Sequence, residues 1–447
     1  MRKLFVFLLS AALVAGCGSS DNDFTDGGSQ PTACSNDGQK QFVLDALYDW
    51  YLWNDQLPAN IDIADYATPE SLVLEVTTTF GPQDALGDPI DRWSSVGSLA
   101  ADQQYFGEGR YEGFGFSWRE EDGEMRMTGV FPDSPADNAG IARGQTVITL
   151  NNRTYADIVA NEGINTFFDN NATVTFEMQR LDATSFSADV TKAIVTITPI
   201  PQWRTVDIGP GVPPVGYMEF RTFVSTADPV FDQVFAEFNA AGVQDVIIDL
   251  RYNGGGLVST AELLGDYLGG FANDGLVFSR TEFNADRAAA NNSTSLFSRR
   301  ANSMDISRFI VIASRSTASA SELVTNSLIP YADVWVVGDN TYGKPVGQVG
   351  IEFCEKILRP TSFRTTNSNG DGDYFDGLPV DCPAADVLDI PVGADNDPNV
   401  IAAVSISQTG ACPVVAAPEF EQAPLMLPEV LYPDVRGNAA RELAGAY

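Results

Sequence analysis

The pattern of apolar and polar residues divides the chain into stretches of different character. Between residues 38 and 100, apolar side chains recur near helical spacing, as at Phe42, Leu44, Leu47 and Tyr51. Such spacing places side chains on one face of a helix. We interpret this aromatic stripe as a core rather than a ligand site and predict a mostly helical region over 38–104.

From residue 105 the period changes to the alternation that is typical of strands. We expect strands over 111–118, 125–131 and 144–150, and a short helix opened by Ser134 and Pro135. These elements predict a β-rich domain over 105–200.

Strands and helices alternate from residue 215 onward. The strands expected are 215–220, 246–250, 309–313 and 334–337, and the helices are 228–242, one ending near 269–270, and 320–328. Asp228 and Pro229 are typical N-cap and N1 residues, and Gly242 is a typical helix end. This βαβ series predicts an α/β domain over 201–412, so the whole chain is expected to be a multidomain protein of mixed α/β and α+β class.

The N-terminus has the composition of an export signal. Two basic residues precede an apolar run from Leu4 to Val14, which is too short to span a bilayer permanently. The sequence LVAGC at 13–17 resembles a bacterial lipobox, which implies cleavage of 1–16 and lipidation of Cys17. Gly18 then implies sorting to the outer membrane, facing the periplasm. Residues 17–37 are expected to form a flexible tether, and residues 413–447 are an unassigned tail.

Composition narrows the function classes. The net charge of −34 argues against nucleic acid as a partner. The chain contains no histidine, which excludes a Ser-His-Asp triad, a Cys-His dyad and His-ligated zinc within it. We expect no cofactor and no metal: the Asn/Asp/Gly-rich stretch 367–373 lacks the late glutamate of a calcium loop and predicts a polar turn.

Four cysteines remain after Cys17: Cys34, Cys354, Cys382 and Cys412. In an oxidising compartment an even number predicts two disulfides. Three pairings are possible, and the sequence leaves them open.

A serine nucleophile and a lysine base stand out as candidate chemistry. Ser319 is expected at the N-terminus of the helix 320–328, where free backbone amides can stabilise an oxyanion. Lys344, one of five lysines, lies near the end of the last strand. A lysine base must be neutral, so we expect Lys344 to be buried among apolar side chains.

Three motifs resemble the C-terminal processing peptidases, also called tail-specific proteases. They are DLRYNGGG at 249–256, TASASE at 317–322 and TYGKPVGQ at 341–348. The resemblance implies a crotonase-like or ClpP-like core, Ser319 as nucleophile, Lys344 as base and Gln348 as the residue that orients the lysine. It also implies an oxyanion hole from the amide of Ala320 and that of Gly255 or Gly254, with Gly255 preferred. Pro345 and Gly347 depart from the more usual pattern.

The segment 105–200 resembles a PDZ domain, through EGFGFSW at 112–118 and the SPADNAGI and GQTVITLN segments that follow. The resemblance implies that the loop of Gly113, Phe114, Gly115 and Phe116 holds a peptide carboxylate while the peptide adds to a sheet edge.

The sequence therefore predicts a lipid-anchored serine endopeptidase that cleaves exported or periplasmic proteins with apolar C-termini. The alternative is a catalytically inactive peptide-binding protein of the cell envelope, but both Ser319 and Lys344 are present. A glycosidase with paired carboxylates suits the acidic composition, but no motif supports it.

Overall fold

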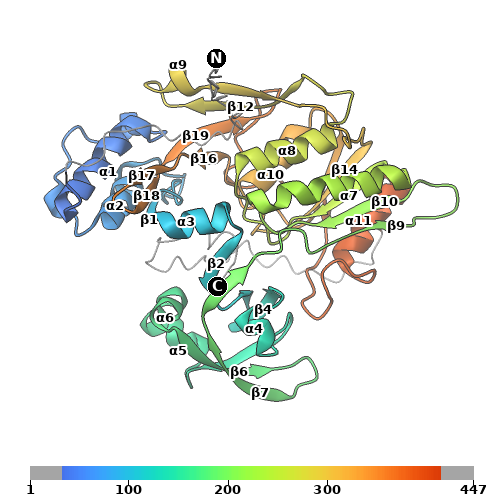
Figure 1. Cartoon of the computed structure of the whole chain (residues 1–447), viewed down its shortest axis with the longest axis horizontal. Coiled ribbons are helices and arrows are strands. Elements are labelled where there is room, and N and C mark those ends of the chain that lie inside the picture. The colour runs from blue at the N-terminus through green and yellow to red at the C-terminus, as the bar shows by residue number, and fades with distance from the viewer. Residues whose placement is uncertain (1–32, 414–447) are drawn as a thin grey trace, which may run out of the picture.

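A computed structural model describes residues 33–413, and its centre is a six-stranded sheet (Figure 1). The strand order is β20-β15-β14-β11-β10-β9, in which β9 alone runs antiparallel to its neighbour. The strands are β9 (Gln202–Val206), β10 (Val215–Glu219), β11 (Asp245–Asp249), β14 (Arg308–Ala313), β15 (Asp333–Gly338) and β20 (Cys382–Pro383).

Helices cover both faces of this sheet, as its apolar strands require. In β11, Val246 and Ile248 face one core while Ile247 faces the other, and all three are fully buried. The first core is covered by α7 (Asp228–Ala241), α8 (Val258–Gly269) and α10 (Ala320–Leu328), and the second by α11 (Pro398–Thr409).

The predicted βαβ series is confirmed. Helix α7 buries Phe231, Val234, Phe235 and Phe238 on one face and ends at Gly242, whose φ of 74° suits glycine. Its start differs from prediction because Asp228 is the first helical residue rather than the cap.

A second, five-stranded sheet has its own aromatic core and lies below the central sheet in Figure 1. Its order is β3-β4-β5-β6-β7. The strand expected over 111–118 is broken at Gly115 (φ 90°), so it becomes β2 (Arg110–Gly113) and β3. The other elements are β3 (Phe116–Glu121), β4 (Glu124–Val130), α4 (Pro135–Asn138), β5 (Thr146–Leu150), α5 (Tyr155–Asn161), α6 (Ile164–Asn170), β6 (Thr173–Gln179) and β7 (Ser185–Thr191). Strand β2 pairs with β8 (Ala193–Thr196).

The N-terminal region is less helical than predicted. It holds α1 (Asn36–Trp50), short 3₁₀ turns at Asn54–Gln56 and Ile63–Asp65, α2 (Pro69–Phe80) and α3 (Leu99–Phe106), but no helix between residues 81 and 94. Helix α1 also begins inside the expected tether. Buried residues of α1 and α2 share one core with Phe353 and Leu358 from late in the chain, so the aromatic stripe is a core as predicted.

Two smaller sheets join segments that are far apart in the sequence. Strand β1 (Ser95–Ser98) pairs with β18 (Lys356–Arg359), which pairs with β17 (Ile351–Phe353). The other sheet has the order β13-β12-β19-β16, formed by β12 (Val277–Phe283), β13 (Ser293–Leu296), β16 (Val346–Gln348) and β19 (Thr361–Thr366), with α9 (Ala288–Asn291) between β12 and β13. Residues 367–373 form the predicted polar turn, in which the amide of Asn367 donates to the carbonyl of Asp371.

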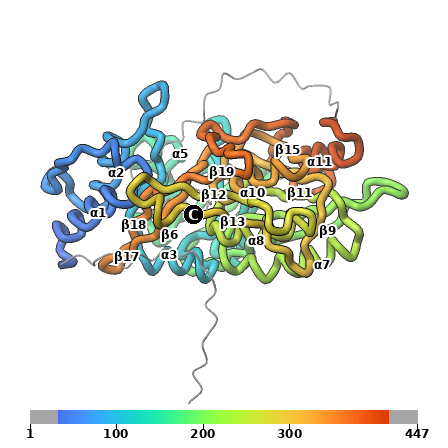
Figure 2. The backbone as a smooth tube through the Cα atoms, turned by 90° about the horizontal axis from the view of Figure 1, so that it is seen from above, coloured from blue at the N-terminus to red at the C-terminus, as the bar shows by residue number. Residues whose placement is uncertain are grey.

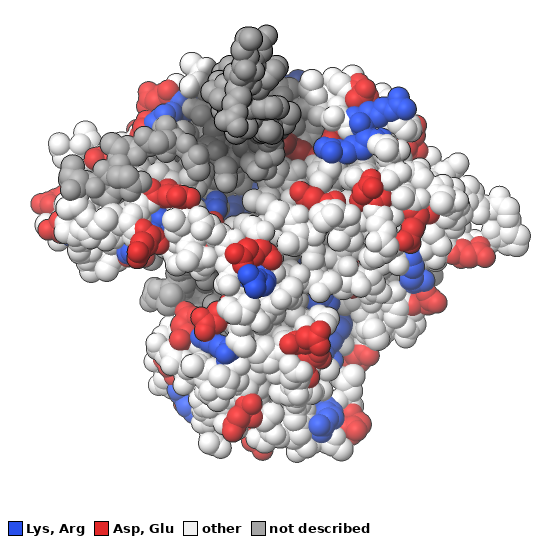
Figure 3. Space-filling model, in the orientation of Figure 1, with Lys and Arg blue, Asp and Glu red and all other residues white. Residues whose placement is uncertain are grey.

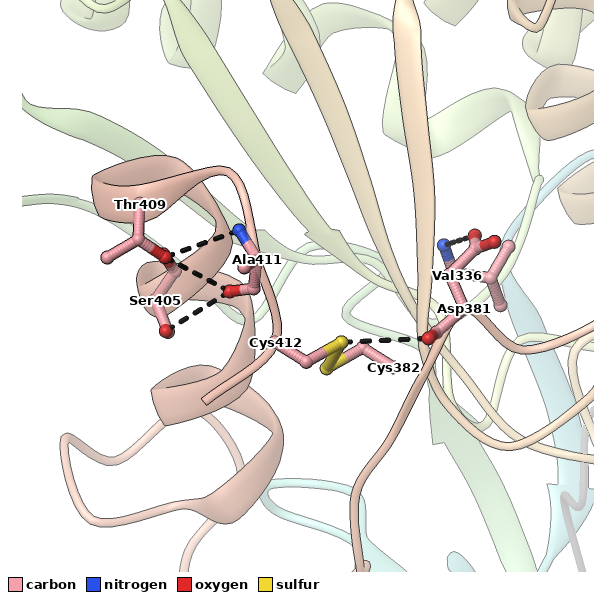
Figure 4. Close-up of a disulfide and its surroundings, with 7 residues drawn as sticks. All are labelled: Val336, Asp381, Cys382, Ser405, Thr409, Ala411 and Cys412. Atoms are coloured by element: carbon pink, nitrogen blue, oxygen red, sulfur yellow. Dashed lines mark hydrogen bonds between the residues drawn. A yellow bond between two sulfur atoms is a disulfide. The ribbon is translucent and has the colours of Figure 1, made fainter. Parts of the chain in front are cut away.

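The structure selects one of the three possible cysteine pairings. Cys34 pairs with Cys354, which joins the start of α1 to the β17–β18 hairpin. Cys382 pairs with Cys412 and joins β20 to the segment after α11 (Figure 4).

On the face shown in Figure 3, acidic side chains are scattered rather than gathered in one patch, and many lie beside a basic residue. Within residues 33–413, no helix has the length and apolarity needed to cross a bilayer. The signal peptide 1–16, Cys17 and most of the tail 413–447 lie outside the described residues.

Candidate active site

Three loops meet at one edge of the central sheet. Strands β11, β14 and β15 are parallel neighbours, so the segments that follow them emerge side by side. These segments are 250–256, 314–319 and 339–344, and each overlaps one of the three predicted motifs. Figure 2 shows β11, β15 and α10 in the same part of the molecule. In open α/β sheets this edge is the usual place of a ligand site.

Ser319 occupies a strained and accessible position at the start of α10. Its backbone has φ 55° and ψ −114°, a conformation that costs a non-glycine residue about 1–3 kcal/mol. It is also the one residue between 317 and 328 that is not buried. The strain therefore presents this hydroxyl at the surface of an otherwise buried segment.

The buried carboxylate of Glu322 joins the serine loop (314–319) to the lysine loop (339–344). Its Oε2 accepts hydrogen bonds from the backbone amides of Ser319 (2.9 Å) and Lys344 (2.8 Å). Its Oε1 accepts from the amide of Gly343 (2.7 Å) and the hydroxyl of Thr341. Burial raises the pKa of Glu322, and these donated hydrogen bonds oppose that rise.

Lys344 is buried, as predicted, with 5% of its surface exposed. Burial lowers the pKa of its ammonium to about 8, against attraction from Asp91 that raises it. Lys344 forms no ion pair with any residue of 33–413, and the ring of Trp93 lies 5.7 Å from its Nζ. By contrast, Lys40, the other buried lysine among residues 33–413, is held by Asp37 and two backbone carbonyls.

Gln348 holds the amine of Lys344. The Nζ atom donates to Oε1 of Gln348 at 2.9 Å. The amide group of Gln348 donates to the carbonyls of Trp93 (2.6 Å) and Arg359 (3.0 Å), which fixes its oxygen toward the lysine.

The backbone amides of Ser319 and Lys344 bind the same carboxylate oxygen of Glu322, but no hydrogen bond connects their side chains. Across the described part of the chain, the amine of Lys344 is hydrogen-bonded to Gln348 and not to the hydroxyl of Ser319. Catalytic hydrogen bonds commonly tighten only when substrate is bound.

The two candidate oxyanion glycines differ in their contacts. The amide of Gly255 already donates to Oδ1 of Asn253 at 2.9 Å. A Cβ at Gly255 would lie 2.8 Å from Cβ of Ser319, so this glycine permits close approach of the two loops. The amides of Gly254 and Ala320 have no hydrogen-bond acceptor among residues 33–413. The geometry therefore favours Gly254 over Gly255 as the partner of Ala320.

Backbone and hydroxyl contacts fasten the loop 250–256 to the serine loop. The carbonyl of Asn253 accepts from the amide of Ala318 (3.1 Å) and the hydroxyl of Ser321 (2.9 Å). The hydroxyl of Thr317 donates to the carbonyl of Leu250 (2.7 Å). A displacement of one loop is therefore transmitted to the other.

Sequence reasoning missed Glu322, Asp91 and Trp93. Glu322 had a local signal, since Ser319-x-x-Glu322 has the form of a capping box. Asp91 and Trp93 had none, because they are far from Lys344 in sequence and reach it only in the folded protein. The carboxylate of Asp91 accepts hydrogen bonds from the amides of Trp93 and Ser94 and from Thr361, and so shapes the loop over the lysine.

The predicted peptide-binding loop lies at an edge of the five-stranded sheet. Gly113 ends β2, and the side chains of Phe114 and Phe116 are fully buried against Phe168 and Phe176. A Cβ at Gly115 would lie 2.1 Å from Cβ of Ser134, so that position requires glycine. Strand β3 is the edge strand beside this loop. The side chains of Phe114 and Phe116 therefore belong to the core of this unit and are not available to a ligand.

Comparison with known proteins identifies the family. Residues 214–380 match the model of peptidase family S41, and residues 38–95 match the peptidase S41 N-terminal domain. The chloroplastic C-terminal processing peptidase of Tetradesmus obliquus is 24% identical over 295 residues, which are 60% of this chain and 59% of the relative. The carboxy-terminal processing protease of Bacillus subtilis is 22% identical over 244 residues, 54% of this chain and 49% of the relative. The matches thus span only about half to three fifths of these curated relatives.

Solved structures agree with the fold. A candidate S41 protease of Bacteroides fragilis superposes with a TM-score of 0.63 at 19% identity, covering 83% of this chain and 97% of that one. The photosystem II D1 C-terminal processing protease superposes with a TM-score of 0.52 at 18% identity, covering 84% of this chain and 99% of that one. The chain belongs to peptidase family S41, and the predicted resemblance and mixed multidomain fold class are confirmed.

The role of Glu322 predicts that Glu322→Gln is strongly destabilising. A glutamine offers one acceptor oxygen and turns an NH₂ group toward amide donors, so the free energy of unfolding should fall by at least about 2 kcal/mol. Thermal unfolding, followed by tryptophan fluorescence, measures the difference in the free energy of unfolding between the variant and the wild-type protein. The matched change on the exposed face of α7, Glu237→Gln, should alter stability by no more than about 0.5 kcal/mol. Equal stability of the two variants would contradict the role given to Glu322.

Proposed function

We propose that this protein is a serine endopeptidase that hydrolyses peptide bonds through an acyl-enzyme, with Ser319 as nucleophile and Lys344 as general base. One observation carries the proposal. A buried lysine with a pKa lowered to about 8 is tied through Glu322 to a strained, accessible serine. Membership of family S41 supports the same chemistry.

The residues present are sufficient for both halves of the reaction. The hydroxyl oxygen of Ser319 bonds to the substrate carbonyl carbon while its proton passes to neutral Nζ of Lys344. The C–N bond then breaks, and the leaving amine takes that proton. Water attacks the ester with the same proton transfer, and the acid product leaves as Ser319 regains its proton. The amides of Gly254 and Ala320 stabilise each oxyanion.

The inactive peptide-binding alternative is not favoured. A protein that only holds peptides has no use for a strained serine or for an amine kept without a counter-ion, since each costs stability. Ser319 and Lys344 retain both features.

The proposed substrates are exported proteins with apolar C-termini, held by the PDZ-like unit. The loop 113–116 beside edge strand β3 supports this mode of binding. We also place the protein in the bacterial cell envelope, anchored by lipid on Cys17 and facing the periplasm. The export signal and lipobox support that proposal, and fractionation of cells producing Cys17→Ser tests it.

Replacing either member of the dyad should abolish catalysis without unfolding the protein. Ser319→Ala and Lys344→Ala are each expected to reduce cleavage of casein by more than about a thousandfold, because the nucleophile or its base is lost. Ser316→Ala, which removes an exposed hydroxyl of the same loop, should cleave at the wild-type rate. Undiminished cleavage by either dyad variant would remove the dyad from the mechanism.

Activity should rise with pH and level off above about pH 8, because only the neutral form of Lys344 accepts a proton. Gln348→Glu places a carboxylate beside the ammonium, which raises the pKa of Lys344 and should move the acidic limb of kcat/KM upward by about one pH unit. Gln233→Glu, the same change on the exposed face of α7, should leave the acidic limb of the kcat/KM profile in place. A Gln348→Glu profile that coincides with wild type, or moves to lower pH, would contradict Lys344 as the titrating base.

Tail recognition predicts a preference for a free C-terminus. Peptides that share one cleavable segment and end in an apolar residue should be cut with a roughly tenfold lower KM as free acids than as C-terminal amides, since the loop amides bind a carboxylate. Mass spectrometry of the products measures the rates. Gly115→Ala should remove the preference, because its Cβ collides with Ser134. Equal cleavage of acid and amide by the wild-type protein would reject tail recognition and leave the dyad intact.

A further inference from the structure

A cluster of positively and negatively charged side chains lies where the five-stranded unit (the domain of β3 to β7, residues 116–191) meets the loop that follows β11 of the central sheet. Asp386, in the segment between β20 and α11, is its centre. The side chain is 15% exposed and pairs with Arg119 at 2.8 Å, Arg143 at 2.6 Å and Arg251 at 3.1 Å. Arg119 and Arg143 belong to the five-stranded unit, whereas Arg251 belongs to the loop after β11.

Asp386 links the buried guanidinium of Arg251 to a second arginine, Arg143. The guanidinium of Arg251 is 2% exposed and contacts three carboxylates, those of Asp249 (2.7 Å), Asp397 (2.7 Å) and Asp386. A buried guanidinium is stable only where carboxylates and other hydrogen-bond acceptors surround it. Arg143, which is 14% exposed, supplies a second positive charge through Asp386. Burial raises the pKa of Asp386, but Arg143 and Arg251 outweigh it and hold the pKa below its usual range.

Tyr252 adds a second link between Asp386 and the same loop. Its hydroxyl accepts a hydrogen bond from Arg143 at 2.6 Å and donates one to Oδ2 of Asp386. The guanidinium of Arg143 also lies over the Tyr252 ring, 5.6 Å from its centre. Two consecutive loop residues, Arg251 and Tyr252, are thus held by one carboxylate.

The held residues directly precede the proposed oxyanion donor. Asn253 follows Tyr252 and fastens the serine loop through its carbonyl, and Gly254 carries the free amide. Shifts of about 1 Å in such donors can reduce rates a hundredfold. Asp386 lies beyond residue 380, where the family match ends, whereas Arg251 and Tyr252 lie within the matched range.

We propose that Asp386 is a positioning residue for the oxyanion loop (250–256). Its carboxylate sets the position of Gly254 by binding Arg251 and Tyr252. Arg119 and Arg143 of the five-stranded unit in turn hold the carboxylate in place. This inference rests on the proposed peptidase function. It makes the docking of the five-stranded unit a requirement for stabilising the oxyanion, in addition to any role in holding substrate.

Asp386→Asn tests the inference, with Asp389→Asn as its matched control. Asp389 lies three residues away and also pairs with an arginine of the five-stranded unit, Arg126 at 2.8 Å, but it has no contact with the oxyanion loop. For cleavage of casein peptides, Asp386→Asn should lower kcat by about tenfold to a hundredfold and change KM by less than about twofold. Asp389→Asn should match wild type in both.

A peptide aldehyde provides a readout that a purely structural role would not move. Its adduct with Ser319 carries an oxyanion, so its inhibition constant should rise in Asp386→Asn in parallel with the fall in kcat, while binding of the corresponding peptide acid stays unchanged. Tyr252→Phe removes one hydroxyl from the link and should show the same pattern with a smaller change. It serves as the test if Asp386→Asn does not fold.

The outcomes separate the two proposals. A folded Asp386→Asn with wild-type kcat and aldehyde inhibition, or an Asp389→Asn equally impaired, overturns the positioning role. If Asp386→Asn does not fold, wild-type behaviour of Tyr252→Phe overturns it instead. If wild-type protein fails to cleave casein, or Ser319→Ala cleaves it equally well, the proposed peptidase function itself fails.

Discussion

The active-site geometry depends on one buried carboxylate. Glu322 sits in the first turn of α10 and collects amide hydrogen bonds from both the serine loop and the lysine loop. A charge buried this deeply is tolerated only when several donors surround it. The same donors are thereby drawn to one point, so the requirement to satisfy the carboxylate also sets the positions of Ser319 and Lys344.

The surroundings of Lys344 come from distant parts of the chain. Trp93 and Asp91 precede β1, while Gln348 belongs to β16, and together they enclose the amine. The N-terminal region is therefore more than an appendage to the central sheet. It shares a core with β17 and β18, and the Cys34–Cys354 disulfide joins the same two regions. Exclusion of water from the lysine depends on this assembly, since desolvation is the largest influence on its pKa.

Arginines hold an acidic chain together at its internal boundary. With a net charge of −34, the chain has many carboxylates and few cations. Three arginines of the five-stranded unit nevertheless pair with aspartates of the segment between β20 and α11. Interfaces between domains are commonly polar and permit movement. Here the polar contacts include a buried guanidinium in the active-site loop, so the orientation of the two units and the shape of the site are linked.

The sequence by itself determined the βαβ order, the dyad candidates and the burial of Lys344, because these follow from apolar periodicity, local motifs and the chemistry of a neutral amine. It left open the cysteine pairing, and it preferred Gly255 as an oxyanion donor although the amide without an acceptor among residues 33–413 is that of Gly254. It also misjudged the break at Gly115 and the helical content of residues 81–94. Such features depend on contacts between segments that are not adjacent in the chain, such as Ser134 against Gly115 or Cys34 against Cys354. A local pattern records which face of an element is apolar, but only the folded chain determines which distant group meets each polar atom.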